Sequence, residues 1–455
     1  MKKKTLCFLL TVALASAFFT GCGSQSDNDA APMEMTENKT DDSADEASLG
    51  EKITLKMAWW GSQERHDKTI AAIELYEKYN PGVDIEYEYY TFDDYFAKLK
   101  SLVASDEVWD IFQLGGNFPQ YIDKIYPLDE FIESGVVDVS GFHDGNLKIT
   151  QTPEGVQLGL TNGINTYGIA YEPELFEEAG AKLPDDNWTW DDYKEAADLI
   201  TENIGIYGSS TFLTSEFIAG CSTYIAQQGE LGQYSFYNLD LTGVGFDDPQ
   251  MLAPYIQMRA DMIRKGSYPD TKASAAVTNI ENDFLVTGEA AMTWVAVNQF
   301  PTIYDICKEQ GRTLALATVP KVTPDGNSGA RIQSSQMLCV SQDSDYKDAA
   351  AAFIGWFETN IDCNRILQAE RGIPANEAVR SALAVDATEG QQLMYEYVAK
   401  ISKLPTPKEI QVLSPDGHDR LVENYINYIQ QVANGEITAE IAADKTYEDA
   451  VAIFK

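Results

Sequence analysis

Hydrophobic and polar residues first alternate along ITLKMAWW, residues 53–60, which predicts a β-strand. Residues 61–82 place their apolar side chains on one helical face and end in Asn-Pro-Gly, so they predict a helix. An alternating strand over 83–90, a helix over 95–103 and an apolar strand over 108–114 follow. This β-α-β-α-β order is typical of a mostly parallel sheet with helices on its faces.

The rest of the chain predicts further elements of both kinds. In PDDNWTWDDYKEAADLI, Thr189 with Asp192 three residues later indicates the start of a helix. The other predicted elements are a short helix and a strand within 282–300, strands over 314–322 and 334–342, and helices over 348–360 and 420–435. We expect the amphipathic helix over 420–435, which stops at Asn-Gly, to close the fold.

The N-terminus predicts export. Three lysines precede a 14-residue apolar run over 6–19, too short to span a bilayer as a mature helix, so residues 1–21 are interpreted as a signal peptide. The sequence FTGC resembles the lipobox of bacterial lipoproteins, although Phe19 replaces the usual leucine. That resemblance implies a lipid anchor on Cys22, with an ordinary signal peptide as the alternative. Lipid chains hold a protein at a membrane through their buried methylenes.

Residues 22–50 predict a disordered acidic tether. From residue 23 on, this stretch carries eight acids, one lysine and almost no large apolar side chain, so it cannot bury enough surface to fold. The remaining chain, about 400 residues of ordinary globular composition, exceeds what one hydrophobic core usually spans. Two lobes are therefore expected.

Charge and composition exclude several classes of function. The chain has 71 acids against 33 bases and a formal net charge of −38, which opposes binding to nucleic acid or anionic lipid. Its three histidines show no metal-ligand spacing, so we expect no metal and no cofactor. Four cysteines remain in the folded part, and we favour buried thiols, although export permits disulfides: Cys221, Cys307, Cys339 and Cys363.

The stretch TNGINTYGIAYEPELFEEAG, residues 161–180, indicates a binding site for something small. It sets Asn162, Asn165 and Tyr167 among glycines and then enters a predicted helix. Amide groups and an aromatic ring on a backbone that glycines keep free to bend are suited to gripping a ligand.

Four segments in order resemble one family. They are GVQLGLTNGINTYGIAYEPELFEEAGAKLPDDNWTWDDYKEAADLI, GEAAM, SSQMLCVSQDSDYKDAAAAFIGWF and RGIPANEAV. Together, from residue 51 to the end, the chain resembles the family 1 extracellular solute-binding proteins of ABC importers, the maltodextrin-binding-like carbohydrate receptors. The resemblance implies a two-lobe α/β fold of the class II periplasmic-binding-protein type, each lobe a mostly parallel sheet flanked by helices. It places residues 51–162 and 327–362 in the N-terminal lobe and 163–326 and 363–455 in the C-terminal lobe, joined by hinge strands.

The resemblance also implies which side chains hold the ligand. Neutral sugars present hydroxyl groups at their edges and C–H patches on their faces, so a receptor uses planar polar groups and flat aromatic rings. The implied ligand-binding residues are Trp60, Gln63, Glu64, Asn117, Asn165, Tyr167, Phe212, Trp294, Asn298, Arg331 and Arg371, with Gln333 beside Arg331. The sugar-stacking tryptophan of relatives aligns with Asn298, whereas this chain has Trp294 four residues earlier.

Each of these residues also has a structural interpretation. Trp59 continues the buried alternation and is expected in the core, while Trp60 and Trp294 fit core or cleft. Asn117 and Asn165 could set turn geometry, because asparagine tolerates left-handed backbone. Arg331 and Arg371 could instead form ion pairs with acidic residues of this protein.

The predicted function is capture without catalysis. The chain is expected to be a monomeric, lipid-anchored receptor on the outer face of a bacterial membrane that hands a carbohydrate to an ABC permease. A surface glycoside hydrolase is the alternative from another class, and it would need paired cleft carboxylates. The strand-end loops offer amides and aromatic rings instead. A receptor of the same fold for a non-sugar solute is the third interpretation.

Overall fold

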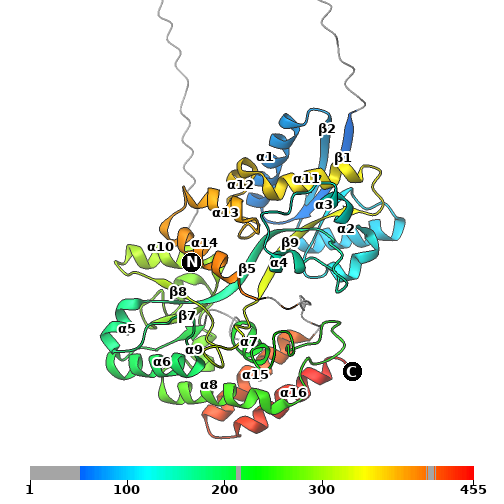
Figure 1. Cartoon of the computed structure of the whole chain (residues 1–455). Coiled ribbons are helices and arrows are strands. Elements are labelled where there is room, and N and C mark those ends of the chain that lie inside the picture. The colour runs from blue at the N-terminus through cyan, green and yellow to red at the C-terminus, as the bar shows by residue number, and fades with distance from the viewer. Residues whose placement is uncertain (1–51, 212–216, 406, 408–414, 416) are drawn as a thin grey trace, which may run out of the picture. The chain divides into compact units, whose positions relative to one another are not determined.

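The computed structural model describes residues 52–211, 217–405, 407, 415 and 417–455 (Figure 1). Its N-terminal strands match the expected pattern: β1 (Ile53–Trp60) pairs parallel with β2 (Val83–Tyr90) over its whole length and with β3 (Ile111–Leu114) near its end. Between them lie α1 (Gln63–Tyr79) and α2 (Phe92–Ser105). The second helix begins three residues earlier than predicted, because the Thr91 side chain accepts a hydrogen bond from Asp94 N.

Two long strands connect the lobes. They are β5 (Leu160–Tyr171) and β9 (Ile332–Ser341), which pair antiparallel with each other from Leu160↔Leu338 to Thr166↔Ile332. The first half of β5 adjoins the β1–β3 side of the sheet through β9, and its second half pairs with β7 (Met292–Ala296) and β8 (Ala315–Ala317). One sheet therefore runs through both lobes, in the order β2-β1-β3-β9-β5-β7-β6.

The sequence predicted that each lobe has a mostly parallel sheet, but only some of the strand pairs are parallel. Parallel pairing holds for β1 with its two neighbours and for β6 (Ser210–Thr211) with β7. The strands β5 and β9 instead pair antiparallel with their neighbours, because each runs from one lobe into the other. The fold is a mixed α/β fold of two lobes, with helices packed on the sheets.

Each lobe has its own hydrophobic core. The first is built around the fully buried Trp59 and includes the inner faces of α1, α11 (Lys347–Thr359) and α12 (Ile361–Leu367). Its members Cys363 and Leu367 carry this core past residue 362, where the sequence interpretation set the lobe boundary. Figure 1 shows α1, α11 and α12 gathered beside β1 and β2.

The second core joins the aromatic start of α6 (Trp190–Ile204) to a group of three helices. The start of α6 is the predicted capping box, with Thr189 and Asp192 bonded to each other's backbone. The helices are α8 (Ala253–Lys265), α15 (His418–Ala433) and α16 (Ala439–Ala452), which pack together (Figure 1). The other described α-helices and strand are α3 (Asp129–Glu133), α4 (Asp144–Lys148), α5 (Pro173–Ala179), α7 (Ser222–Ala226), α9 (Thr271–Ser274), α10 (Phe300–Glu309), α13 (Glu377–Ala384), α14 (Glu389–Ile401) and β4 (Ile125–Tyr126).

Two sequence predictions about helices are wrong. The helix over 420–435 does not close the fold, because α16 follows it and buries alanines, Ala439, Ala442 and Ala443 among them, rather than the large apolar residues that mark an amphipathic helix. The short helix expected after residue 282 is replaced by turns. There, Asp283 accepts hydrogen bonds from Leu285 N and Thr293 Oγ1, and these local bonds compete with helical ones.

The buried cysteines agree with the favoured interpretation. Cys307, Cys339 and Cys363 are buried free thiols, and burial raises the pKa of each. Cys221 is buried as well.

Candidate functional site

One face of the β5–β9 ribbon brings together four polar residues that the sequence predicts for the ligand. Asn165 pairs directly with Gln333, and because side chains alternate along a strand, Tyr167 and Arg331 lie on the same face two residues further on. On the opposite face, Ile164 and Ile332 pack with Ile373, Tyr397 and Ile401. One face of the ribbon therefore carries these polar side chains, while the isoleucines of the other face pack against the chain around Ile373 and, at Ile332, also line the cavity described below.

The hinge amide Asn165 is connected to the loop after β7. Its Nδ2 donates to Asn298 Oδ1 at 3.0 Å, and its Oδ1 accepts from the backbone N–H of Asn298 at 3.2 Å. The same oxygen accepts from Thr166 N at 3.0 Å. Asn298 is exposed, so the pair offers its remaining donors and acceptors to solvent or to a ligand.

Two glycines of β5 lie where other parts of the chain come too close for a side chain. A Cβ on Gly163 would lie 2.6 Å from the backbone of Gly372, and one on Gly168 would lie 2.9 Å from the Tyr397 hydroxyl. Neither glycine has a positive φ. Here glycine allows three chain segments to pack closely at the crossing.

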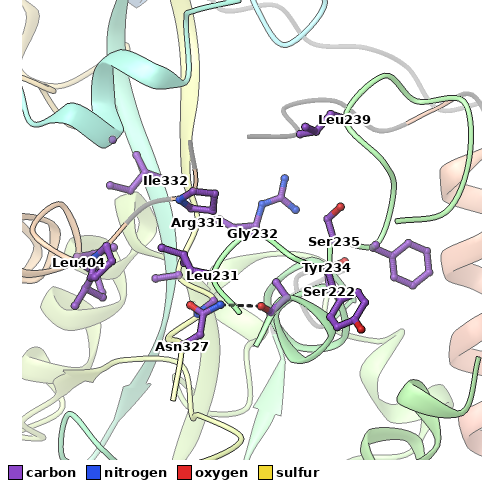
Figure 2. A pocket seen from close by; sticks show the side chains of 18 residues that line it. Ser222, Leu231, Gly232, Tyr234, Ser235, Leu239, Asn327, Arg331, Ile332 and Leu404 are labelled. Atoms are coloured by element: carbon purple, nitrogen blue, oxygen red, sulfur yellow. Dashed lines mark hydrogen bonds between the residues drawn. The ribbon is translucent and has the colours of Figure 1, made fainter. Parts of the chain in front are cut away.

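A cavity of about 280 Å³ opens beside this crossing (Figure 2). Its lining combines hydroxyl and amide groups with apolar side chains and one guanidinium group. Figure 2 shows Leu231, Leu404 and Ile332 on one side and Ser235 and Tyr234 on the other, with Arg331 extending between them. The other described lining residues are Gly145, Ser222, Ala226, Gly232, Phe236, Leu239, Asn327, Gly329, Ala330, Ile401, Pro405 and Pro407.

Arg331 links the cavity to the hinge face. It lies directly before β9, and its carbonyl oxygen accepts a hydrogen bond from Thr166 Oγ1 at 2.8 Å. Burial lowers the pKa of its guanidinium. Burial also raises the pKa of the Tyr167 phenol, and the neighbouring positive charge of Arg331 opposes that shift.

The predicted residues of the first lobe lie at the ends of β1 and β3, outside this cavity. Half-buried Trp60 packs against an aromatic group, with ring centroids 5.5 Å from Phe92 and 5.2 Å from Phe96. Gly115 lies between the Trp60 ring and Asn117, whose Oδ1 accepts from Gly115 N at 3.2 Å. Trp60 and Asn117 are therefore close neighbours.

Two further predicted residues are exposed on the first turn of α1. Gln63 Nε2 donates to Asp67 Oδ1 at 2.8 Å, and Glu64 pairs with Lys68 at 2.8 Å. These are contacts within one helix, of the kind that stabilises an exposed helical face. Neither residue lines the cavity.

Arg371 does not face the cavity. It is fully enclosed, and its Nη1 donates to Gln113 Oε1 at 2.5 Å while its Nη2 donates to Thr69 Oγ1 at 2.8 Å. Burial lowers the pKa of this guanidinium to about 9. The Arg371 side chain points into the first lobe and is enclosed there. It is therefore not placed to contact a ligand, as the sequence predicted it would.

Trp294 is also enclosed, in the second core. Its ring stacks on Trp190 with centroids 5.7 Å apart, and its Nε1 donates to the Tyr193 hydroxyl at 3.1 Å. It has no exposed surface, because the inward position on β7 points to the helices. The predicted stacking platform is therefore not at Trp294. Phe212 and Cys22 lie outside the described residues.

Sequence reasoning missed most of the cavity lining. Tyr234, Ser235 and Phe236 lie in the segment ELGQYSFYNLD, where aromatic residues in a polar stretch after two glycines were an available signal. Leu404 and Pro405 gave no comparable signal, because their place beside the hinge depends on how the chain after α14 folds back.

Comparison with known proteins assigns the family. The sequence model of the family described as "Bacterial extracellular solute-binding protein" matches residues 61–361. The chain belongs to this family. It is also 27% identical over 130 residues to the putative ABC transporter periplasmic-binding protein YcjN of Escherichia coli, a match that spans 30% of that relative.

Solved structures share the fold of this solute-binding protein. A family 1 extracellular solute-binding protein from Alicyclobacillus acidocaldarius is 23% identical with a TM-score of 0.77, covering 89% of this chain and 99% of that one. A periplasmic oligogalacturonide binding protein from Yersinia enterocolitica is 20% identical with a TM-score of 0.72, covering 88% and 99%. The sugar-binding protein MalE from Xanthomonas citri is 18% identical with a TM-score of 0.67, covering 88% and 97%.

The family sets the general role of the chain. It is an extracellular protein of a family that binds solutes. Within the described ranges, no three His, Cys, Asp or Glu side chains gather as a metal ion would require. None of the described helices combines the length and apolar character needed to cross a membrane.

Proposed function

We propose that this solute-binding protein captures an oligosaccharide beside its hinge and delivers it unaltered to an ABC permease. The observation that carries the proposal is the cavity beside the crossing of β5 and β9, lined in part by Arg331 and Ile332. Hydroxyls, an amide and a guanidinium bind sugar edges, and apolar side chains cover C–H faces. Structural relatives support a sugar, since they include a periplasmic oligogalacturonide binding protein and the sugar-binding protein MalE.

The capture site adjoins the strands along which the lobes are connected. A ligand that contacts both Arg331 and the Asn165–Asn298 pair would favour whichever arrangement of the lobes brings its contacts together, and closure then follows from that difference in affinity. The permease would recognise the liganded arrangement.

A binding experiment tests this function. Residues 50–455, which form one compact unit, are screened by thermal shift against mono- and oligosaccharides, and the hits are titrated calorimetrically. Stability rises by RT ln(1 + [L]/Kd) when a ligand binds the folded state alone, so a true ligand raises the melting temperature. We expect one-to-one binding and a sugar recovered intact. Steady release of shorter sugars would identify a hydrolase instead.

The proposed lipid anchor has its own test. Cys22→Ser in the full chain removes the thiol that would carry the lipid, so we expect the protein to leave the membrane fraction. Cys307→Ser, which removes a buried thiol of the second lobe, serves as the matched control and should remain membrane-bound. Membrane retention of the Cys22→Ser protein would contradict the lipoprotein assignment.

A further inference from the structure

Phe92 exposes an aromatic ring at the edge of the first lobe's sheet where the parallel strands end. It is 57% exposed, more than any other phenylalanine, tyrosine or tryptophan in the part of the chain that the structure describes. It is the first residue of α2 and follows β2 with only Thr91 between them. Because β1 runs parallel to β2 and to β3, the carboxyl ends of all three strands meet at this edge, where open α/β sheets bind their ligands.

An aromatic group holds the Phe92 ring in place. The centroid of this ring lies 5.5 Å from that of Trp60, with the two rings perpendicular, and 4.9 Å from that of Phe96. Trp60 in turn packs at 5.1 Å against Tyr95, which has no exposed surface. The Tyr95 hydroxyl donates to Gln113 O at 2.7 Å and accepts from Gln113 N at 2.9 Å. The exposed ring is therefore preorganised, so a ligand that packs on it loses little affinity to ordering the protein.

Asn117 supplies a hydrogen-bond donor beside this aromatic group. A Cβ on Gly115 would lie 3.8 Å from both the Trp60 ring and Asn117 Oδ1, so the ring and the amide are neighbours. Asn117 Oδ1 accepts from Gly115 N, whereas its Nδ2 donates to no other described residue. A flat apolar ring and an unengaged amide N–H match the C–H face and the hydroxyl edge of one sugar ring.

Position distinguishes Phe92 from the other exposed aromatic residues. Tyr79 is almost as exposed, at 54%, but it ends α1, just before β2 begins at Val83. The start of a parallel strand lies at the edge of the sheet opposite to its end, so Tyr79 lies away from the edge that binds ligands. Trp294, which the sequence predicted as the stacking ring, has no exposed surface.

We infer that Phe92 is the platform on which a sugar ring of the captured ligand stacks, with Asn117 Nδ2 donating to a hydroxyl group of the same ring. This inference rests on the proposed function and adds a contact residue that the sequence analysis did not name. When the lobes close on a sugar beside the hinge, the carboxyl edge of the first lobe would supply this second surface.

The test compares matched variants on sugars of known structure. The screen of mono- and oligosaccharides includes maltotriose, cellotriose, xylotriose and galactotriose, and each sugar that binds residues 50–455 is titrated calorimetrically into the variants. Phe92→Ala removes the ring, Phe92→Leu keeps apolar area without a flat ring, and Phe92→Trp enlarges the ring. Tyr79→Ala is the control, since it removes an almost equally exposed ring from the opposite edge of the sheet. Thermal melts without sugar establish that each variant is folded.

We expect Phe92→Ala to weaken sugar binding at least about fivefold, because the C–H face of the sugar loses the ring on which it packs. Phe92→Leu should recover little of this loss, Phe92→Trp should bind at least as tightly as the unaltered protein, and Tyr79→Ala should bind equally well. Asn117→Asp keeps the acceptor for Gly115 N and removes only the donor, so it should weaken binding severalfold.

Four results would overturn the inference while leaving the receptor function standing. They are unchanged affinity in Phe92→Ala, equal losses in Phe92→Ala and Tyr79→Ala, full affinity in Phe92→Leu, and unchanged affinity in Asn117→Asp. Full affinity with leucine would show that apolar area, and not a flat ring, holds the sugar. Failure of every sugar in the screen to bind the unaltered protein would overturn the proposed function as well.

Discussion

Arg331 and Arg371 occupy opposite kinds of surroundings, although the sequence predicted a ligand contact for both. Arg371 is enclosed, and its guanidinium donates to Gln113 and Thr69. Arg331 is half-buried and extends into the cavity beside the hinge. A buried charge requires fixed partners inside the protein, whereas a charge that lines a cavity can also contact a ligand. The comparison divides the predicted site into a supporting part and a binding part.

Trp294 and Asn165 show the same difference between a supporting and a binding residue. Trp294 belongs to the supporting part, since its ring stacks on Trp190 in the second core. Asn165 belongs to the binding part, on the polar face of the β5–β9 ribbon with exposed Asn298. Substitutions in the first group should change stability, and substitutions in the second should change affinity.

The largest effect is expected for Trp294→Ala. Removing a fully buried tryptophan leaves a cavity in the second core, so the free energy of unfolding should fall by about 3–5 kcal/mol. Chemical denaturation measures the change. Trp60→Ala, at a half-buried position, is the control and should cost clearly less. A Trp294→Ala protein that keeps its stability but loses sugar binding would contradict the assignment of Trp294 to the supporting part.

Arg371→Met should lower the free energy of unfolding by about 2–3 kcal/mol. The substitution leaves Gln113 Oε1 and Thr69 Oγ1 without a charged donor in a buried site. Denaturant titration of Arg331→Met provides the matched comparison, for which we expect a change below about 1 kcal/mol. Equal losses from both arginines would show that their surroundings do not separate their roles.

Asn165→Ala should weaken sugar binding by about 1–3 kcal/mol, because hydroxyl groups of the ligand lose a partner. Titration calorimetry with a sugar from the thermal-shift screen measures it. Asn434→Ala, at the exposed end of α15, should leave affinity unchanged. Unchanged affinity in Asn165→Ala would place the site away from the hinge face.

A prediction on pH dependence concerns Glu358, a buried acid on α11 that accepts a hydrogen bond from Asn162 Nδ2 at 2.8 Å. Burial raises its pKa well above 4.5, so the folded state holds the proton more tightly than the unfolded state. Its contribution to stability is then complete below pH 4.5 and is lost as the pH rises through the folded-state pKa.

Glu358→Gln keeps a hydrogen-bond acceptor and removes this titration. We expect the variant to lose less stability than the unaltered protein between pH 4.5 and neutral pH, measured by denaturation across that range. Glu436→Gln, at an exposed site after α15, is the control. Identical pH profiles for all three proteins would contradict a raised pKa at Glu358.

Much of the fold could be predicted because local patterns determine it. The alternation in 53–60 and 83–90 and the capping pair Thr189 and Asp192 each produced the expected element. The helix α16 could not, since its buried alanines carry little apolar contrast.

The candidate site was predicted less completely, for a physical reason. The sequence places Arg371 and Arg331 at chain crossings, but tertiary packing decides into which space each side chain points. Tyr234 and Leu404 reach the cavity from segments separated by 170 positions, and no local pattern relates them. The motifs located the hinge, and packing created the cavity.

A crystal structure of residues 50–455 with a bound oligosaccharide tests the central claim most directly. We predict an intact sugar in the cavity beside the hinge, with a polar atom within hydrogen-bond distance of the Arg331 guanidinium and another near Asn165 or Asn298. A sugar bound in another part of the molecule, with Arg331 and Asn165 making no contact to it, would contradict the account.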